Sequence, residues 1–396
     1  MSTQVVVLGS GYAGTGAVKR LEEELGSDAE LTWVSENDYH LVLHEVHRCI
    51  RDPSAESKVA IPVDEIKSPE TEFVKGHVEN VDVDERVVEL EDGDVDYDYL
   101  LVCLGSATAF YGIEGLQEYS YELKGLDDAR EIHSAIESAA EDATRDDPAK
   151  VIVGGAGLSG IQSAGEIAGY RDDNRAPIDI SIVEGLDEVF PGNDRELQGA
   201  LRKRLEARDI SILTGDFISK VDEDYVYLGG GEDEDPEELD YDVLIWTGGI
   251  TGQKEVAEAD VDKDERSNRI FTDADFQTSD DRVFSLGDSA LVEQGTDSVA
   301  PPTAQAAWQA ADVAGENVAR AVKGQPLKTW THEDKGTVVS VGHDAVAHGV
   351  KLPGFGKIPV NVFGGPAART LKKGIAAKWI ADVTTPRRAV EAWDSM

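Results

Sequence analysis

Apolar and polar positions follow the same order in two distant parts of the chain. In each part a short apolar run, typical of a buried parallel strand, precedes a glycine-rich turn and then apolar residues at helical spacing. The first part predicts a strand at 4–8, a helix at about 14–24 and a strand at 30–35. The second predicts a strand from residue 150, a helix ending near residue 170 and a strand at 177–185. Each part is expected to form a β-α-β unit.

Each unit is followed, later in the chain, by a segment that matches its counterpart: "VDYDYLLVCLGSAT" at 95–108 and "LDYDVLIWTGGIT" at 239–251. A further apolar run, "RVFSLGDSA" at 282–290, precedes two prolines and a long helical pattern that opens near Thr303. This duplication predicts an α/β protein with two doubly wound Rossmann-type domains and a small C-terminal region. The expected limits are 1–110 and 256–325 for the first domain, 111–255 for the second, and 326–396 for the C-terminal region.

Both turns carry the spacing G-x-G-x-x-G. In such a turn the first glycine permits the tight reversal, the second lets the backbone approach a diphosphate, and the third lets the helix pack on the strand. The helix N-terminus then offers free N–H groups to the diphosphate. The glycines concerned are Gly9, Gly11 and Gly14 in the first unit and Gly155, Gly157 and Gly160 in the second. The sequence therefore predicts two dinucleotide sites.

An acidic residue follows each turn by roughly 20 residues, where a carboxylate can accept hydrogen bonds from a ribose. These residues are Glu36 in the first unit and Glu184 in the second. Because a carboxylate at Glu184 repels a 2′-phosphate and the local "VEGLDEV" contains no arginine, NADH is favoured over NADPH. Two such sites suit an enzyme that holds a flavin in one and receives a nicotinamide in the other.

Further positions are expected to hold the ribityl chain and ring of the flavin. Asp288, at a strand end after Gly287, could bond the ribityl hydroxyls. The helix that opens near Thr303 would direct its positive end at the ring, with the N–H groups of Ala304 and Gln305. The glycines near the ends of the two matching segments complete the FAD site and the NADH site, respectively: Gly105 and Gly248.

The charge balance narrows the choice of partners. The chain has 79 acidic and 37 basic residues, a net charge of −42, and the acidic residues are spread over its whole length. Nucleic acid is excluded because its phosphates would be repelled, and we expect the acidic surface to be an adaptation to very high salt. The N-terminus runs directly into a strand and no apolar run is long enough to span a membrane. We therefore expect a protein of the cytoplasm or of the cytoplasmic face of the membrane.

Cysteines and histidines offer little further chemistry. Cys49 and Cys103 form no C-x-x-C pattern, so neither a redox disulfide nor a zinc site is expected. His40, His44 and His47 have the spacing of one helical face, but no other ligand type accompanies them. We expect no metal, and interpret His40 as structural or flavin-adjacent and the other two as pocket lining.

Six motifs carry a family resemblance: "NDYH" at 37–40, "YDYLLVCLGSATAFYGIEGLQEYSYELKGLDDA" at 97–129, "GLSGIQSAGEI" at 157–167, "FSLGDSA" at 284–290, "APPTAQAAWQ" at 300–309 and "DKGTVVSVG" at 334–342. On these, nearly the whole chain resembles the two-dinucleotide flavoprotein oxidoreductases, and within them type II NADH dehydrogenase, the single-subunit NADH:quinone oxidoreductase. The resemblance implies FAD on the first unit, NADH on the second and a quinone near the C-terminal region, without cysteine redox chemistry. It also implies catalytic roles for Glu166, Gln305 and Gln309.

The chain departs from the family at three places. Aligned on "YH", the ribose-binding acid of the family falls at Ser35, one position before Glu36. Gln162 stands where the family has a glutamate in "GVELAGEL", which leaves Glu166 as the local carboxylate and an expected proton relay. The C-terminal tail is also less apolar than is usual.

That tail, from residue 365, is basic in an acidic chain. With Leu371, Ile375, Trp379 and Ile380 at helical spacing, it is expected to lie on an anionic membrane surface, basic side down and tryptophan at the interface. Packing on the acidic body of the protein or on a dimer partner is the alternative. The expected partners are thus NADH, a quinone and, through residues 365–396, a membrane surface, and a homodimer is allowed.

Other functions remain open at this stage. A sulfide:quinone oxidoreductase needs cysteines to carry sulfur, and Cys49 alone is plausibly placed. A ferredoxin-type reductase would use the same cofactors with a soluble acceptor, and a flavin-based NADH sensor would be reduced without turnover. A disulfide reductase would need a neighbouring cysteine pair, which this sequence lacks.

Overall fold

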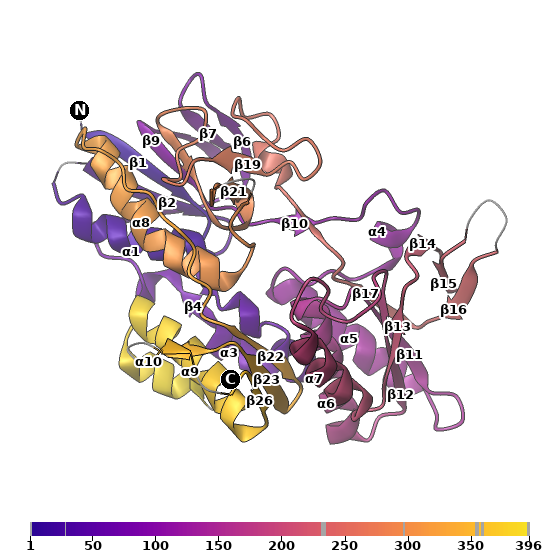
Figure 1. The fold of residues 1–396 in the computed structure, drawn as a ribbon. Helices are drawn as coiled ribbons and strands as arrows, with labels where there is room; N and C mark the ends of the chain where they lie inside the picture. The colour runs from indigo at the N-terminus through magenta and orange to yellow at the C-terminus, as the bar shows by residue number, and fades with distance from the viewer. Residues whose placement is uncertain are drawn as a thin grey trace.

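The computed structural model describes residues 2–27, 29–230, 235–295, 298–352, 356–357 and 360–393. Within these residues two parallel sheets lie apart from each other, each with its own helices, and a C-terminal region packs beside both (Figure 1). The predicted α/β class with two doubly wound units is confirmed. No helix among the described residues is both long enough and apolar enough to cross a membrane.

The first sheet has β1 near its centre, and the four apolar residues Val5 to Leu8 of this strand are at most 1% exposed. Such burial is typical of a parallel strand that is covered on both faces. The strand order reverses between β1 and β9, which is where ligands bind in doubly wound sheets. The order is β20 (Val283–Ser285), β9 (Tyr99–Val102), β1 (Thr3–Leu8), β2 (Ala29–Ser35) and β5 (Glu72–Lys75).

Helices α1 (Tyr12–Glu24) and α8 (Ala304–Val322) pack side by side on this sheet (Figure 1). Small residues allow the close approach, since a Cβ on Gly16 would lie 2.6 Å from the Cβ of Ala311, and one on Gly315 would lie 2.7 Å from the carbonyl oxygen of Ala17. The contact holds the start of α8 against the turn η5 (Gly287–Ser289).

The second sheet repeats the plan with β13 (Ile210–Thr214), β12 (Ile178–Glu184), β11 (Ala149–Gly154) and β17 (Val243–Trp246). Its helices are α5 (Leu126–Asp142), α6 (Leu158–Asn174) and α7 (Arg195–Glu206). Each sheet is accompanied by a small antiparallel sheet. These are β6 (Val78–Asp82), β7 (Val87–Leu90) and β8 (Gly93–Asp96) for the first, and β14 (Ile218–Val221), β15 (Tyr225–Leu228) and β16 (Glu237–Asp240) for the second.

The C-terminal region contains the antiparallel strands β22 (Thr337–Val341), β23 (Asp344–His348) and β26 (Val362–Gly364), followed by α9 (Pro366–Val383) and α10 (Pro386–Ala392). The remaining short elements are β3 (Tyr39–Leu41), α2 (Arg48–Arg51), α3 (Glu56–Val59), β4 (Ala60–Pro62), β10 (Ala107–Thr108), α4 (Leu116–Tyr119), β18 (Ile250–Thr251), β19 (Ile270–Thr272), β21 (Ala290–Val292), β24 (Lys351–Leu352), β25 (Gly356–Lys357), η1 (Leu43–Glu45), η2 (Pro53–Ala55), η3 (Val63–Glu65) and η4 (Lys254–Val256).

The predicted orientation of the tail helix is wrong. Trp379 and Ile380 of α9 are each 1% exposed, and Trp379 lies against Trp308 of α8, with ring centroids 4.9 Å apart. Lys372 is buried as well, so Trp379, Ile380 and part of the basic side face the protein, whereas Ile375 of the same stripe is exposed. The helical spacing predicted from the sequence is present. Its tryptophan packs on α1 and α8 instead of facing a membrane.

Candidate functional site

The first glycine turn connects β1 to α1. Gly9 has φ of +96°, a conformation that side chains rarely adopt, and a Cβ on Gly14 would lie 2.0 Å from the carbonyl oxygen of Gly9. A Cβ on Gly11, in contrast, would meet nothing within 4 Å. Gly9 and Gly14 are therefore required by the fold, whereas the open space at Gly11 fits the approach of a diphosphate to the backbone.

The second turn has the same geometry. Gly155 has φ of +93°, and a Cβ on Gly160 would lie 1.9 Å from the carbonyl oxygen of Gly155. Gly157 again has nothing within 4 Å. Gly248, just beyond β17, lies against this turn, because a Cβ on Gly155 would be 2.8 Å from the Cα of Gly248. Two glycine turns of one design, each with the geometry that suits an anion, are thus present in the chain.

The acids after the two turns are not equivalent. Glu184 ends β12, and its carboxylate accepts hydrogen bonds from the N–H groups of Ala156 (2.8 Å) and Leu186 (3.0 Å). Strand pairing places Val183 opposite Gly154 and Val34 opposite Leu8, so the counterpart of Glu184 is Ser35.

Ser35 is buried and its hydroxyl lies 2.8 Å from that of Ser10, inside the first turn. Glu36 follows one position later, with its side chain 69% exposed and 3.7 Å from His77. The sequence-based choice of Glu36 therefore differs by one residue from the position that strand register assigns.

The predicted flavin-facing residues come together beside the first turn. A Cβ on Gly287 would lie 3.0 Å from that of Ala13 in α1. The hydroxyl of Ser289 donates to the carbonyl of Gly105 (3.0 Å), and the hydroxyl of Ser106 donates to the carboxylate of Asp288 (3.3 Å). These contacts join the end of β9 to η5, at the edge where β1 and β9 diverge.

Lys124 is an addition that the sequence did not single out. Its ammonium donates to the hydroxyl of Ser106 (3.1 Å), and burial lowers its pKa while Asp288 acts in the opposite direction. Lys124 lies in "ELKGLDDA", part of a motif that carries the family resemblance, but nothing in this motif indicates which residue contacts the first domain.

The side chains of Gln305 and Gln309 bind the loop before β22. The amide of Gln305 donates to the carbonyl of Gly336 (3.0 Å) and accepts from the N–H of Lys335 (2.8 Å). Gln309 donates to the carbonyl of Glu333 (2.9 Å) and accepts from its N–H (3.2 Å). Both amides thus hold the loop to the first turns of α8, whose N-terminus is capped by the hydroxyl of Thr303.

A buried charge cluster, formed by Glu45, Arg48, Arg51, Glu166 and Lys372, lies between the two sheets and α9. Glu166 is fully buried in α6, and its carboxylate lies 3.6 Å from Arg48 and 3.3 Å from Arg51. Glu45 is equally buried, accepts a hydrogen bond from Arg48 and lies 3.6 Å from the ammonium of Lys372. The cluster therefore joins all three parts of the chain through paired charges.

Burial controls the proton affinities in this cluster. It raises the pKa of Glu166, although Arg48 and Arg51 act in the opposite direction. It also lowers the pKa of Lys372 to about 8, even with Glu45 beside it. Burial would raise the pKa of Glu45 as well, but Lys372 and Arg48 outweigh it and hold that pKa well below its usual value. Of the two carboxyl groups in the cluster, Glu166 is the one whose pKa is raised.

The three histidines do not share a helical face, contrary to the sequence-based reading. His40 lies in β3, His44 in the turn η1 and His47 at the start of α2, because the chain reverses after β3. His40 links the first turn to the tail: its Nδ1 lies 2.7 Å from the carbonyl of Ser10, and its Nε2 lies 2.7 Å from the indole N–H of Trp379. This pairing requires the proton on Nδ1, and burial lowers the pKa of His40 to about 4. His40 is a neutral structural residue.

Both cysteines are buried, and they lie in different elements: Cys49 in α2 and Cys103 just after β9. Cys49 is 2% and Cys103 is 3% exposed, and burial raises the pKa of the Cys49 thiol to about 12. Thiolate chemistry at neutral pH is therefore disfavoured at either position.

Comparison with known proteins points in the same direction. Residues 3–311 match the family described as pyridine nucleotide-disulphide oxidoreductase. A type II NADH:quinone oxidoreductase of Staphylococcus saprophyticus is 28% identical over 360 residues, 87% of this chain and 89% of the relative. A Staphylococcus aureus protein of the same name is 28% identical over 372 residues, 89% of this chain and 91% of the relative.

Solved structures share the fold. NDH2 of Plasmodium falciparum in complex with NADH gives a TM-score of 0.81 at 15% identity, covering 100% of this chain and 98% of that one. The sulfide:quinone oxidoreductase of Aquifex aeolicus gives 0.79 at 17% identity, covering 98% and 92%. At these identities the likeness establishes the architecture, and the chemistry must come from the residues.

Proposed function

Because this chain belongs to the pyridine nucleotide-disulphide oxidoreductase family, we propose that it is an FAD-dependent NADH:quinone oxidoreductase of the type II NADH dehydrogenase kind. The observation that carries the proposal is the pair of glycine turns with one geometry, each opening a helix at the switch point of its own sheet. Relatives of nearly the same length that carry this name support it.

The first turn fits FAD. The open space at Gly11 would admit the diphosphate, and Asp288, fixed by Ser106, would face the ribityl hydroxyls. When bound there, FAD supplies the hydride acceptor and passes two electrons on to the quinone. The N–H groups of Ala304 and Gln305, at the positive end of α8, would stabilise negative charge on the ring. The other residues assigned to this site are Gly9, Gly14, Glu36, Gly105 and Gly287.

The second turn fits NADH. Glu184 is oriented by two backbone N–H groups and retains lone pairs for the ribose hydroxyls, while its charge disfavours a 2′-phosphate. Gly157 leaves space for the diphosphate, and Gly248 borders the turn. The other assigned residues are Gly155 and Gly160.

The net reaction, NADH + H⁺ + quinone → NAD⁺ + quinol, consumes one proton. We assign its relay to Glu166, because burial raises its pKa and its neighbours Arg48 and Arg51 hold it in place. Gln305 and Gln309 are assigned to positioning, since their amides fix the loop of residues 333–336 against α8.

The quinone is assigned to the C-terminal region, with the chain lying peripherally on the cytoplasmic face of the membrane. Trp379 is buried, so membrane contact would use other residues of the tail. Val390 is 74% exposed on α10, Ile375 is 37% exposed on α9, and the side chain of Arg387 is 88% exposed. Exposed apolar and cationic side chains on neighbouring helices suit an anionic interface.

Sulfide oxidation is disfavoured because it needs an accessible sulfur carrier, and both Cys49 and Cys103 are buried. The deciding experiment is anaerobic stopped-flow on the FAD-loaded protein in high potassium chloride, mixed first with NADH and then with a short-chain quinone. Fast bleaching of the flavin by NADH and fast recovery with quinone are expected. Bleaching without recovery would indicate a soluble acceptor or a sensor, and bleaching only by sulfide would reject the proposal.

A further inference from the structure

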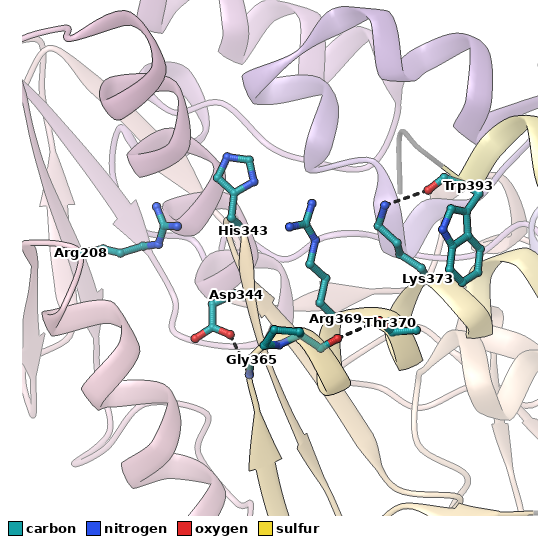
Figure 2. Close-up of a pocket in the computed structure, with 9 residues that line it drawn as sticks. Arg208, His343, Asp344, Gly365, Arg369, Thr370, Lys373 and Trp393 are labelled. Atoms are coloured by element: carbon teal, nitrogen blue, oxygen red, sulfur yellow. Dashed lines mark hydrogen bonds between the residues drawn. The ribbon is translucent and has the colours of Figure 1, made fainter.

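A basic pocket opens where α9 begins, between the C-terminal region and the second sheet. It has a volume of about 610 Å³ and is bordered by the first turns of α9, the turn between β22 and β23, and the residue segment after α7. Figure 2 shows Arg369 reaching from α9 into the space between His343 and Lys373, with Arg208 on the opposite wall. None of these residues belongs to either glycine turn.

The cation at the centre of this pocket is available for a ligand. No hydrogen bond or ion pair joins the guanidinium of Arg369 to any other residue that the structure describes. Arg208 lies 3.3 Å from one carboxylate oxygen of Asp172, and Lys373 donates to the carbonyl oxygen of Trp393 at 2.9 Å. Three cations thus converge although most charges of the chain are negative.

The one carboxylate in the lining does not neutralise them. Asp344 is engaged by Arg204 (2.9 Å) and by the N–H groups of Gly365 (2.9 Å) and Ala345 (2.7 Å). Holding the unpaired guanidinium of Arg369 near Arg208 and Lys373, which have partners of their own, costs electrostatic free energy. An anion bound beside Arg369 would remove this local cost, although the net charge of the whole chain is −42.

Helix α9 adds to the same potential. Its N-cap residue, Gly365, makes no side-chain cap, and the helix begins at Pro366 on the wall of the pocket. The positive end of the helix dipole therefore acts together with Arg369, one turn further on. The planar fork of an arginine matches the oxygens of a phosphate, which a point charge such as lysine does not.

We propose that this pocket binds a phosphate group, supplied either by the headgroup of an anionic phospholipid or by a free phosphate ion. Arg369 is the principal ligand, Arg208 and Lys373 complete the cationic wall, and Trp393 closes one side. Val390 and Arg387 of α10, close in sequence to Trp393, are highly exposed. The site is additional to the NADH and quinone chemistry and does not depend on it.

The test compares Arg369→Gln with Arg145→Gln, which removes the same charge from an exposed loop before β11. Two probes are used on the FAD-loaded protein: sedimentation with vesicles of phosphatidylglycerol in phosphatidylcholine, and calorimetric titration with inorganic phosphate. We expect Arg369→Gln to weaken at least one of them about tenfold, or ~1.4 kcal/mol, and Arg145→Gln to weaken neither. The binding of Arg369→Lys should lie between that of the wild type and that of Arg369→Gln, because lysine keeps the charge and lacks the planar fork of arginine.

The two probes distinguish the two sources of the phosphate group. Loss of vesicle binding alone assigns the site to a lipid headgroup, and loss of phosphate binding alone assigns it to the free ion. If Arg369→Gln and Arg145→Gln behave alike with both probes, the proposal is wrong. Bleaching of the flavin by NADH, which should be unchanged in Arg369→Gln, shows that the variant is folded and keeps this result separate from the proposed enzyme activity.

Discussion

The ammonium of Lys372 donates a hydrogen bond to the amide oxygen of Gln162, and so joins the C-terminal helix α9 to helix α6 of the second sheet. The same ammonium donates to the hydroxyl of Ser340 at 2.7 Å and pairs with Glu45. One side chain from the tail therefore contacts both other parts of the chain. At position 162 a glutamate would add a third buried carboxylate to Glu45 and Glu166, whereas a glutamine accepts the bond without a charge.

Removal of the Lys372 ammonium should lower the free energy of unfolding. Lys372→Met leaves Glu45 buried with Arg48 as its remaining ion-pair partner, and we expect a loss of about 3–5 kcal/mol in the free energy of unfolding. Chemical denaturation of the FAD-loaded protein measures it. Lys378→Met serves as the control, because the Lys378 side chain is 65% exposed in an i,i+4 pair and should cost no more than about 1 kcal/mol. Equal losses for the two variants would contradict the role given to Lys372.

The buried Lys372 also predicts a pH dependence. Its pKa is about 8 in the folded protein, against about 10.4 for a lysine in water. Between these values the unfolded chain binds the proton and the folded chain does not, so this group makes the free energy of unfolding rise with pH. Below the folded pKa both states are protonated and the penalty of burying the charge is present in full.

Denaturation of the wild type and of Lys372→Met, repeated from pH 7 to pH 10.5, isolates this contribution as a difference. We expect the difference between the two proteins to widen with increasing pH above about 8, with a slope of at most about 1.4 kcal/mol per pH unit. A difference that stays constant over this range would show that Lys372 has an ordinary pKa.

Glu166 should separate the two halves of the reaction. In Glu166→Gln we expect reduction of the flavin by NADH to stay within a factor of about three, and its reoxidation by quinone to slow about 100-fold, because the relay is lost. In the wild type the reoxidation rate should decrease as pH rises through the raised pKa of Glu166, and the variant should lack that step. Stopped-flow traces across pH measure both.

Asp179→Asn, an exposed acid on β12, is the matched control for Glu166. It should leave both half-reactions unchanged. A normal pH profile of reoxidation in Glu166→Gln would move the proton transfer to another group.

The second and third glycines of the first turn should behave differently. Gly11 has φ of −71° and free space around it, so Gly11→Ala should leave the thermal stability of the FAD-free protein unchanged and weaken FAD binding at least about tenfold. Gly14→Ala should fail to fold normally, since its Cβ would lie 2.0 Å from a carbonyl oxygen. Flavin titration and thermal unfolding give the two readouts. FAD bound by Gly11→Ala with wild-type affinity would place the diphosphate elsewhere.

Cofactor choice should depend on Glu184. In Glu184→Ala we expect the ratio of kcat/KM for NADH to that for NADPH to fall about tenfold, because the ribose loses an acceptor and a 2′-phosphate loses a repulsive charge. Asp187→Ala removes an exposed charge three residues away and should change the ratio little. Steady-state rates with NADH and NADPH measure this ratio. An unchanged ratio in Glu184→Ala would show that Glu184 does not bind the ribose.

Much of the fold could be predicted because its signals are local. The apolar runs of β1 and β11, their turns and the helices that follow are each contained in about 20 residues, so pattern alone places them. The fingerprint glycines and Glu184 lie where that pattern predicted. The limits of the domains stay a prediction, as does the adaptation to high salt.

The buried charge cluster could not be predicted, because its members are scattered from Glu45 to Lys372 and each resembles an ordinary surface charge in sequence. The face of α9 was misjudged for a related reason. Helical spacing identifies a stripe that includes Trp379, but not whether lipid or the pair α1 and α8 covers it. At Glu36 the alignment on "YH" indicates an offset of one residue, and strand pairing gives the same offset. The role of Glu36 stays a prediction.

The first sheet has a consequence for synthesis on the ribosome. Its edge strand β20 pairs with β9, although the whole second sheet lies between them in the chain. While the intervening residues are made, β9 presents an open edge, and α1 lacks its partner α8. The second sheet, which is continuous in sequence, can fold first and bring the two ends together. A nascent chain that stalls before residue 283 would therefore hold one complete sheet and one sheet with an unpaired, aggregation-prone edge. This makes the protein a natural client for chaperones.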